Sequence, residues 1–136
     1  MAAVTELIRM EENGSLSFGN HTLDSKTKME DFPANGNLYK VKTFKELTKL
    51  ERDGMFVYES EPGTSVNDFA ALNNGVSFTV SGNEDAMITV GLEADTEYSV
   101  TVADKAVGTI KTNLGGKLSF SVNLEGEGEV AVSIVK

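Results

Sequence analysis

The sequence predicts an all-β protein, built as an antiparallel β-sandwich with a set of hairpins on its N-terminal side. Hydrophobic and polar residues alternate almost strictly between Gly75 and Lys136, and only the β pleat sends successive side chains to opposite faces. Turn residues divide this half of the chain into segments about ten residues apart, which is the spacing of sandwich strands. Asn-Gly and Asp-Gly pairs mark tight turns in the other half.

Two hairpins are predicted in the N-terminal half. Asn13-Gly14 and Asp53-Gly54 suit the positive φ of two-residue turns, and they separate residues 5–10 from 16–22 and residues 49–52 from 55–60. The polar stretch 23–37 between them reads as a long connection. Residues 44–51 have a weak helical pattern through Phe44, Leu47 and Leu50, which indicates one or two turns of helix there.

Pro62 and Gly63 interrupt the pattern, since proline cannot donate to a central ladder. We therefore expect a single compact domain over 1–136, with 1–61 and 62–136 as possible sub-units. Residues 64–74 are expected to form a loop or a loose edge strand, and 113–116 a hairpin loop. The predicted strands after residue 74 are 75–81, 86–92, 97–103, 107–112, 117–124 and 129–136.

Composition excludes several classes of site. The chain has no cysteine and one histidine, His21, so neither a disulfide framework nor a zinc site is expected. The net charge of −9 would repel nucleic acid and anionic membranes. The lysines at 40, 42, 45 and 49 are the local exception, and their alternation with Tyr39, Val41 and Thr43 indicates a solvated strand face.

The chain shows no secretory segment, because its N-terminal residues contain no unbroken apolar stretch of about seven residues. No segment approaches the roughly 20 apolar residues of a membrane span. We therefore expect a cytoplasmic protein or a domain of a larger one.

Tyr98 is the expected structural anchor of the C-terminal half. Leu92, Thr96, Tyr98 and Val100, in the stretch LEADTEYSV, resemble the tyrosine corner of immunoglobulin-like and fibronectin type III domains. In those families the tyrosine hydroxyl turns back onto the backbone and locks a crossover between sheets. Ala94 stands where a proline is common, so the topology is left open between an immunoglobulin-like and a jelly-roll-like sandwich.

A second resemblance covers most of the chain. The stretches NGSLSFGNHTL, LYKVKTFKELTKLERDGMFVYESEPGT and IKTNLGGKLSFSV resemble small stand-alone bacterial proteins that carry the label endosialidase. The resemblance implies a glycosidase. Sialidase-type sites hold a carboxylate with three arginines, however, and this chain has only Arg9 and Arg52. We therefore expect no enzyme and assign no catalytic residue.

Other catalytic arrangements are equally unsupported. The pairs Glu59 with Glu61 and Glu84 with Asp85 lie in polar stretches where solvated carboxylates are the rule. His21 lies between turn residues, and no GxSxG elbow is present to supply a nucleophile. No cofactor or metal is expected.

Binding remains as the expected function. We expect a non-enzymatic interaction module that acts through self-association or a protein partner, with Tyr39, Phe56 and Tyr58 as the candidate platform. The apolar residues on both faces around Phe56 and Tyr58 suit a strand buried on two sides, either inside the fold or at a subunit contact. The alternative is a carbohydrate-binding accessory module, in which the same aromatic rings would stack on a glycan.

Overall fold

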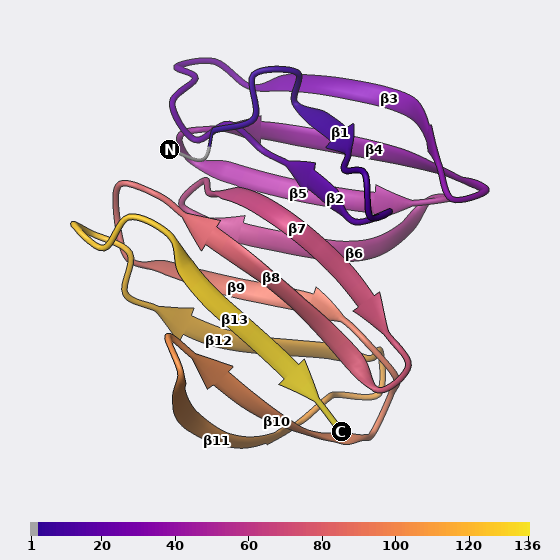
Figure 1. The fold of residues 1–136 in the computed structure, drawn as a ribbon, viewed down its shortest axis with the longest axis vertical. Helices are drawn as coiled ribbons and strands as arrows, with labels where there is room; N and C mark the ends of the chain where they lie inside the picture. The colour runs from indigo at the N-terminus through magenta and orange to yellow at the C-terminus, as the bar shows by residue number, and fades with distance from the viewer. Residues whose placement is uncertain (1–2) are drawn as a thin grey trace.

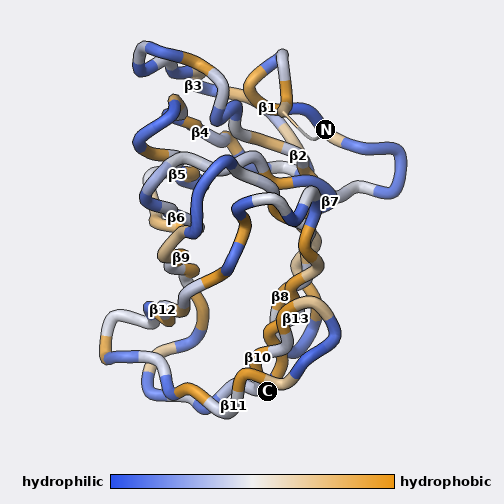
Figure 2. The backbone as a smooth tube through the Cα atoms, turned by 90° about the vertical axis from the view of Figure 1, so that its left-hand side faces the viewer, coloured by the Kyte–Doolittle hydropathy of each residue, from blue (hydrophilic) through white to orange (hydrophobic). Residues whose placement is uncertain are grey.

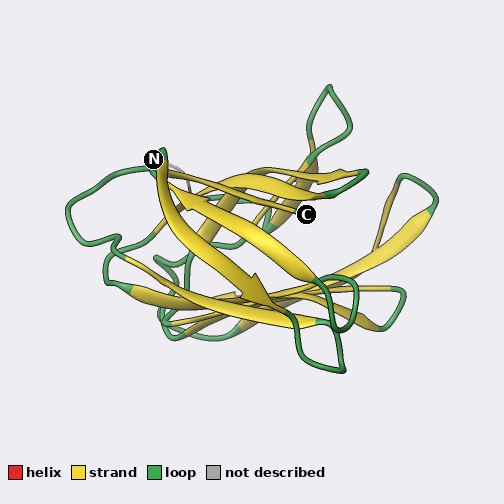
Figure 3. Cartoon of the chain, turned by 90° about the horizontal axis from the view of Figure 1, so that it is seen from below, coloured by secondary structure: helices red, strands yellow, loops and turns green. Residues whose placement is uncertain are grey.

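The computed structural model describes residues 3–136 and confirms the all-β prediction. The described residues form two antiparallel sheets packed as a sandwich, with no helix (Figure 1, Figure 3). The seven-stranded sheet has the order β1 (Ile8–Met10), β2 (Leu16–Phe18), β7 (Ser65–Leu72), β8 (Gly75–Ser81), β13 (Val130–Val135), β10 (Glu97–Val102) and β11 (Lys105–Lys111). The six-stranded sheet has the order β12 (Lys117–Val122), β9 (Ala86–Gly91), β6 (Met55–Glu61), β5 (Leu47–Arg52), β4 (Asn37–Phe44) and β3 (Thr27–Ala34).

The last six strands pair in a nested order. β8 pairs with β13, β9 with β12, and β10 with β11, so one long antiparallel ribbon is folded across both sheets. The six strands predicted after residue 74 are all present. In β8, β12 and β13 the alternating side chains match one buried and one exposed face, whereas β11 has no buried residue.

Both sheets contain strands from both halves of the chain. β2 pairs with β7 in one sheet and β6 pairs with β9 in the other, so the ladders cross the Pro62-Gly63 interruption. The buried hydrophobic side chains form one cluster that extends from Ile8 to Ile134. Figure 2 shows the two layers edge-on, with hydrophobic positions distributed along both.

The two predicted hairpins are confirmed, and the predicted helical turn is wrong. Residues 44–51 belong to the β4–β5 hairpin, in which Phe44 pairs with Leu47 around a two-residue turn. Thr48 and Leu50 are buried on one face of β5. Alternate burial against the opposite sheet therefore overrides the weak helical spacing, and the β-branched Thr48 suits a strand.

The polar stretch 23–37 also differs from the prediction, because it contains β3. Of this strand only Ala34 is buried, since β3 lies at the sheet edge and has charged side chains on both faces. Its pairing with β4 is interrupted by a bulge near Asp31, which has a φ of 58°. A strand exposed on both faces has no hydrophobic alternation to reveal it.

Two predictions around the C-terminal ribbon need correction. Residues 65–72 form β7, a strand that lies inside the sheet between β2 and β8 and has a bulge at Asp68. They form neither a loop nor an edge strand. Residues 113–116 do not form a hairpin loop, because β11 and β12 lie at the edges of different sheets. This connection instead crosses from one layer to the other, from β11 in the seven-stranded sheet to β12 in the six-stranded sheet.

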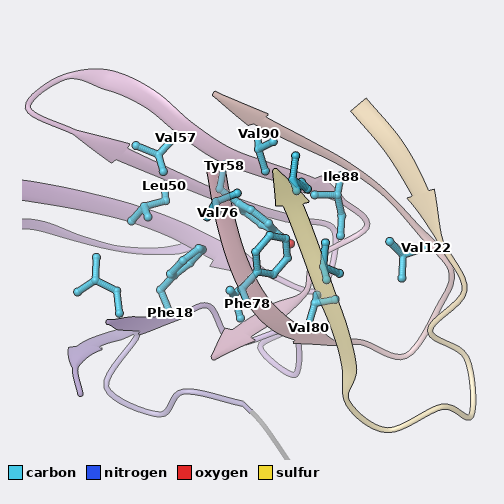
Figure 4. Close-up of a cluster of buried hydrophobic side chains, with 14 of the residues drawn as sticks. Phe18, Leu50, Val57, Tyr58, Val76, Phe78, Val80, Ile88, Val90 and Val122 are labelled. Carbon is cyan, nitrogen blue, oxygen red and sulfur yellow. The ribbon is translucent and has the colours of Figure 1, made fainter. Parts of the chain in front are cut away.

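Aromatic rings fill the centre of the core. Tyr58 makes edge-to-face contacts with Phe18, Phe69 and Phe78, with ring centroids 5.3 to 6.3 Å apart. Such contacts add to the burial of the rings themselves. Figure 4 shows Phe18, Tyr58 and Phe78 converging between the two layers.

Candidate functional site

The structure separates the three residues of the predicted platform. Tyr58 is fully buried in the aromatic cluster, and Tyr39 is also buried. Neither ring is available for stacking on a ligand, so these two platform residues are corrected to core residues. Phe56 alone is partly exposed.

A β-bulge explains why apolar residues occupy both faces of β6. Leu50 pairs with Tyr58 and Glu51 pairs with Phe56, so Val57 is the extra residue of the bulge. Val57 and Tyr58 are therefore buried one after the other. The two-sided apolar pattern arises inside the fold, because β6 lies between β5 and β9.

Phe56 lies at the edge of a hollow at one end of the sandwich. The ammonium group of Lys117 lies 4.5 Å from the centroid of the Phe56 ring, which is cation–π distance. Gly91 provides the space behind the ring, because a Cβ at this position would lie 2.6 Å from the Phe56 carbonyl oxygen. Phe56 is therefore held on the sheet surface between a glycine and a lysine.

The hollow has a volume of about 370 Å³ and is formed where several connections meet. Met55 begins β6 directly after the β5–β6 turn, Leu72 ends β7 directly before the β7–β8 turn, and Glu93 belongs to the β9–β10 crossover. Gly115 of the β11–β12 crossover also lines it. Loops at the end of a rigid sandwich are where binding residues commonly lie. We call this surface the loop-end hollow.

Tyr98 lies in the floor of the loop-end hollow. The backbone N–H of Glu93 donates a hydrogen bond of 3.3 Å to the Tyr98 hydroxyl. Tyr98 is the second residue of β10. This strand directly follows the crossover from β9 in the other sheet. The contact thus ties the crossover to the strand that it enters.

The charged groups at the loop-end hollow are unevenly paired. Lys136 forms an ion pair of 2.7 Å with Glu93, and this hydrogen bond raises the pKa of Lys136. Lys111 pairs with Asp95 at 3.2 Å. Within residues 3–136, neither Arg52 nor Lys117 has an acidic partner within ion-pair distance. Two cations therefore remain uncompensated beside the hollow.

The opposite end of the sandwich contains the histidine. The His21 Nδ1 atom lies 2.7 Å from the Ser65 hydroxyl, and the His21 backbone N–H donates to the same oxygen at 3.2 Å. Burial lowers the pKa of the imidazole. Ser65 is fully buried, so its hydroxyl is a structural partner of the histidine and lies out of reach of a substrate.

The candidate carboxylate pairs do not form a joint site. Glu59 and Glu61 alternate with the buried Ser60 on the outer face of β6. The Asp85 carboxylate accepts the N–H groups of Leu124 and Glu125, at 2.9 and 3.2 Å, and so holds the β12–β13 loop. Sequence reasoning missed this role, because it joins positions far apart in the chain.

The described residues contain no group of three or more metal-ligating side chains, and no helix that could cross a membrane. The two arginines lie in different sheets. Arg9 on β1 is paired with Glu6 and Glu11, at 3.3 and 2.9 Å, whereas Arg52 ends β5. They do not form an arginine cluster.

Comparisons with known protein families, curated proteins and solved structures found no match to this chain. The molecule is thus defined by its β-sandwich fold and by the loop-end hollow. Sequence reasoning included Phe56 but missed Met55, Arg52 and Leu114. Two signals pointed to them, since Met55 follows a tight Asp-Gly turn and Leu114 stands in a polar, glycine-containing connection.

Proposed function

We propose that this protein is a non-enzymatic interaction module that self-associates through the surface around the loop-end hollow. The observation that carries the proposal is the position of its most exposed apolar side chains. Leu114 is 85% exposed and Met55 is 69% exposed, the highest values among the large hydrophobic residues that the structure describes. Met55 lines the hollow, and Leu114 precedes the lining residue Gly115.

Further apolar surface surrounds these two side chains. Leu72 is also exposed, and Phe56 contributes part of its ring to the same hollow. Single exposed apolar residues are ordinary, but apolar residues gathered around a hollow and rimmed by charge are typical of protein interfaces. Burying each such side chain in an interface contributes about 1.5 to 3 kcal/mol.

Pairing of strand edges offers a weaker route to self-association. β1 has three residues, β3 contains Pro33 and a bulge, and β11 is bulged against β10. Short, bulged or proline-containing edges resist pairing with another chain. β12 is the remaining edge, and it is regular. Its first residue is Lys117, so the loop-end hollow adjoins this edge as well.

Light scattering during size-exclusion chromatography tests the proposal on the whole chain. We expect a mass above the 14.6 kDa of one chain, increasing with concentration. The double variant Met55→Ser/Leu114→Ser should weaken association by roughly 100-fold, since two buried side chains are lost. The control variant Leu38→Ser/Val107→Ser removes two side chains that are 50% and 51% exposed elsewhere, and should assemble like the unmodified protein.

A monomer at millimolar concentration would overturn the proposal. Assembly that is unchanged in Met55→Ser/Leu114→Ser would show that another surface, such as the β12 edge, makes the contact.

A further inference from the structure

The net negative charge of the molecule is concentrated at the end opposite the loop-end hollow. Six connections lie at this end: β2–β3, β4–β5, β6–β7, β8–β9, β10–β11 and β12–β13. Their acidic residues are Asp24, Glu46, Glu84, Asp85, Asp104, Glu125, Glu127 and Glu129, and their only basic residues are Lys26 and Lys45. Since the charges are so unequal, this end attracts cations strongly.

The β12–β13 loop carries three of these acidic residues, and all of its residues from 125 to 129 are exposed. Its sequence from 125 to 129 is EGEGE, which we call the acidic loop. Gly126 and Gly128 have φ values of +74° and +73°, and nothing lies within 4 Å of a Cβ built on either of them. Figure 1 shows this yellow loop projecting from the left of the molecule, away from the C-terminus at the lower right. The tip of the acidic loop is therefore open to solvent, while Asp85 holds the base of the loop through the Glu125 N–H.

The end of the sandwich that contains the loop-end hollow has the complementary features. The loop-end hollow is concave, with a volume of about 370 Å³. Beside it Arg52 and Lys117 have no acidic partner in residues 3–136, as described above. An arginine can bind a carboxylate through two parallel hydrogen bonds, which makes Arg52 suited to a glutamate.

We propose that the acidic loop of one copy docks into the loop-end hollow of the next, so that the protein assembles head to tail. This inference rests on the proposed self-association and specifies its geometry. The projection and the hollow lie at opposite ends of one chain, so the two copies use different surfaces. Such a heterologous contact leaves one free acidic loop and one free hollow on every open assembly, which therefore closes into a ring or extends into a filament.

Charge is what distinguishes this arrangement from a two-fold dimer. A two-fold contact through the hollow would bring the unpaired Arg52 and Lys117 of both copies together, which is unfavourable for like charges. Head-to-tail docking instead places glutamates beside these cations. The contact should weaken as salt is added, because both sets of charges are exposed and screened.

Complementary charge reversal provides the test. Variant R52E/K117E reverses the charge beside the loop-end hollow and keeps the acidic loop. Variant E125K/E127K/E129K reverses the charge of the acidic loop and keeps the loop-end hollow. Each variant alone should be monomeric by light scattering, at the 14.6 kDa of one chain. Mixed in equal amounts, they should assemble again with the two kinds of copy alternating, because the intact loop meets the intact hollow and the lysines of the reversed loop meet the glutamates of the reversed hollow.

Circular dichroism first establishes that each variant is folded, and the neutral variants R52Q/K117Q and E125Q/E127Q/E129Q replace any that is not. Mixed in equal amounts, the neutral pair should form a dimer of one copy of each, because only one intact loop and one intact hollow remain and growth stops there. The control K28E/K105E makes the same change in net charge at exposed sites elsewhere, and should assemble like the unmodified protein.

The outcomes separate the two proposals. An unmodified protein that stays monomeric would overturn both self-association and the head-to-tail geometry. An unmodified protein that assembles, with variants that assemble equally well alone, would overturn only the geometry. Variants that are monomeric alone and remain monomeric when mixed would also overturn it, since complementary charges would then fail to restore the contact.

Discussion

The Tyr58 hydroxyl lies in a buried chain of hydroxyl groups. It contacts the Thr64 Oγ1 atom at 2.8 Å, and Ser60 contacts the same atom at 2.7 Å. Thr48 donates to the Thr64 carbonyl oxygen at 2.6 Å and lies 2.9 Å from the Thr43 hydroxyl. Burial raises the pKa of Tyr58, because the low-dielectric core disfavours a phenolate. These contacts allow polar groups between two apolar sheets without leaving them unpaired.

Replacing Tyr58 by phenylalanine should therefore destabilise the protein by about 1 to 2 kcal/mol, the usual cost of a lost buried hydrogen bond. Urea denaturation measures this change. Tyr39→Phe is the matched control, because Tyr39 is buried but its hydroxyl makes no hydrogen bond in residues 3–136. Equal stability of Tyr58→Phe and Tyr39→Phe would contradict a role for the hydroxyl chain.

His21 should make folding sensitive to mild acid. Burial lowers its pKa below the ordinary 6.5, so the unfolded chain binds a proton more readily than the folded protein does. Between about pH 6.5 and the lower folded value, the free energy of unfolding should therefore decrease as the pH falls. Above pH 6.5 the imidazole is neutral in both states and contributes no slope.

Proton NMR measures the folded pKa directly, because the chain contains a single histidine. We expect a midpoint below 6.5, and His21→Gln should remove this part of the pH dependence of urea denaturation. Carboxylates titrate at lower pH and remain in both proteins, so the difference between the two curves isolates the histidine. A midpoint above 6.5 would contradict the expected burial effect.

At the scale of elements, crossovers between sheets depend on glycines that have no room for a side chain. Gly63 lies in the β6–β7 crossover, and its N–H donates to the Lys45 carbonyl oxygen at 3.0 Å. A Cβ on Gly63 would lie 1.9 Å from the Phe44 carbonyl oxygen, which belongs to the backbone of the neighbouring hairpin. This close contact fixes how the chain leaves the six-stranded sheet.

Gly63→Ala should cost about 3 kcal/mol or more, because backbone atoms must move to admit the methyl group. Thermal denaturation measures the loss. Gly115→Ala is the control, since its nearest contact would be the Asn113 side chain at 3.4 Å, and the change should be small. A Gly63→Ala protein as stable as the control would show that the crossover adapts freely.

The strands that the sequence predicted best are those with one buried and one exposed face. β8, β12 and β13 alternate in burial along nearly their whole length. The alternation of hydrophobic and polar residues in the sequence therefore identified them. β3 was missed because neither of its faces is buried, and the β4–β5 turn was mistaken for a helix because it is too short to interrupt the apolar spacing. Which sheet each strand joins was not predictable, because alternation is the same in both layers.

The candidate site was predicted only in part, for a related reason. Phe56 was identified as aromatic on a mixed strand, but so was Tyr58, and a bulge at Val57 decides that one ring is exposed and the other buried. A bulge leaves no clear mark in the residue types of β6. The loop-end hollow also joins residues from turns far apart in the chain, and the nested pairing that brings these turns together comes from long-range contacts.

At the scale of the whole molecule, continuous ladders predict a single folding unit. β2–β7 and β6–β9 pairing crosses the Pro62-Gly63 interruption in both sheets, and one hydrophobic cluster contains side chains from both halves. Separating residues 1–61 from 62–136 would expose the edges of β6, β7 and β9 together with the apolar face behind them. We therefore expect neither fragment to fold alone.

Fluorine NMR of the protein labelled with 3-fluorotyrosine tests this cooperativity, since Tyr39 and Tyr58 lie in the first half and Tyr98 in the second. All three signals should disappear at the same urea concentration. When either half unfolds, the β2–β7 and β6–β9 pairing is lost, and the other half loses its partner in the shared core. The unlabelled protein followed by circular dichroism is the control for the effect of fluorine. If the Tyr98 signal persisted after those of Tyr39 and Tyr58 were lost, the C-terminal ribbon would be a separate folding unit, and the nested pairing of β8 to β13 would be sufficient to stabilise it.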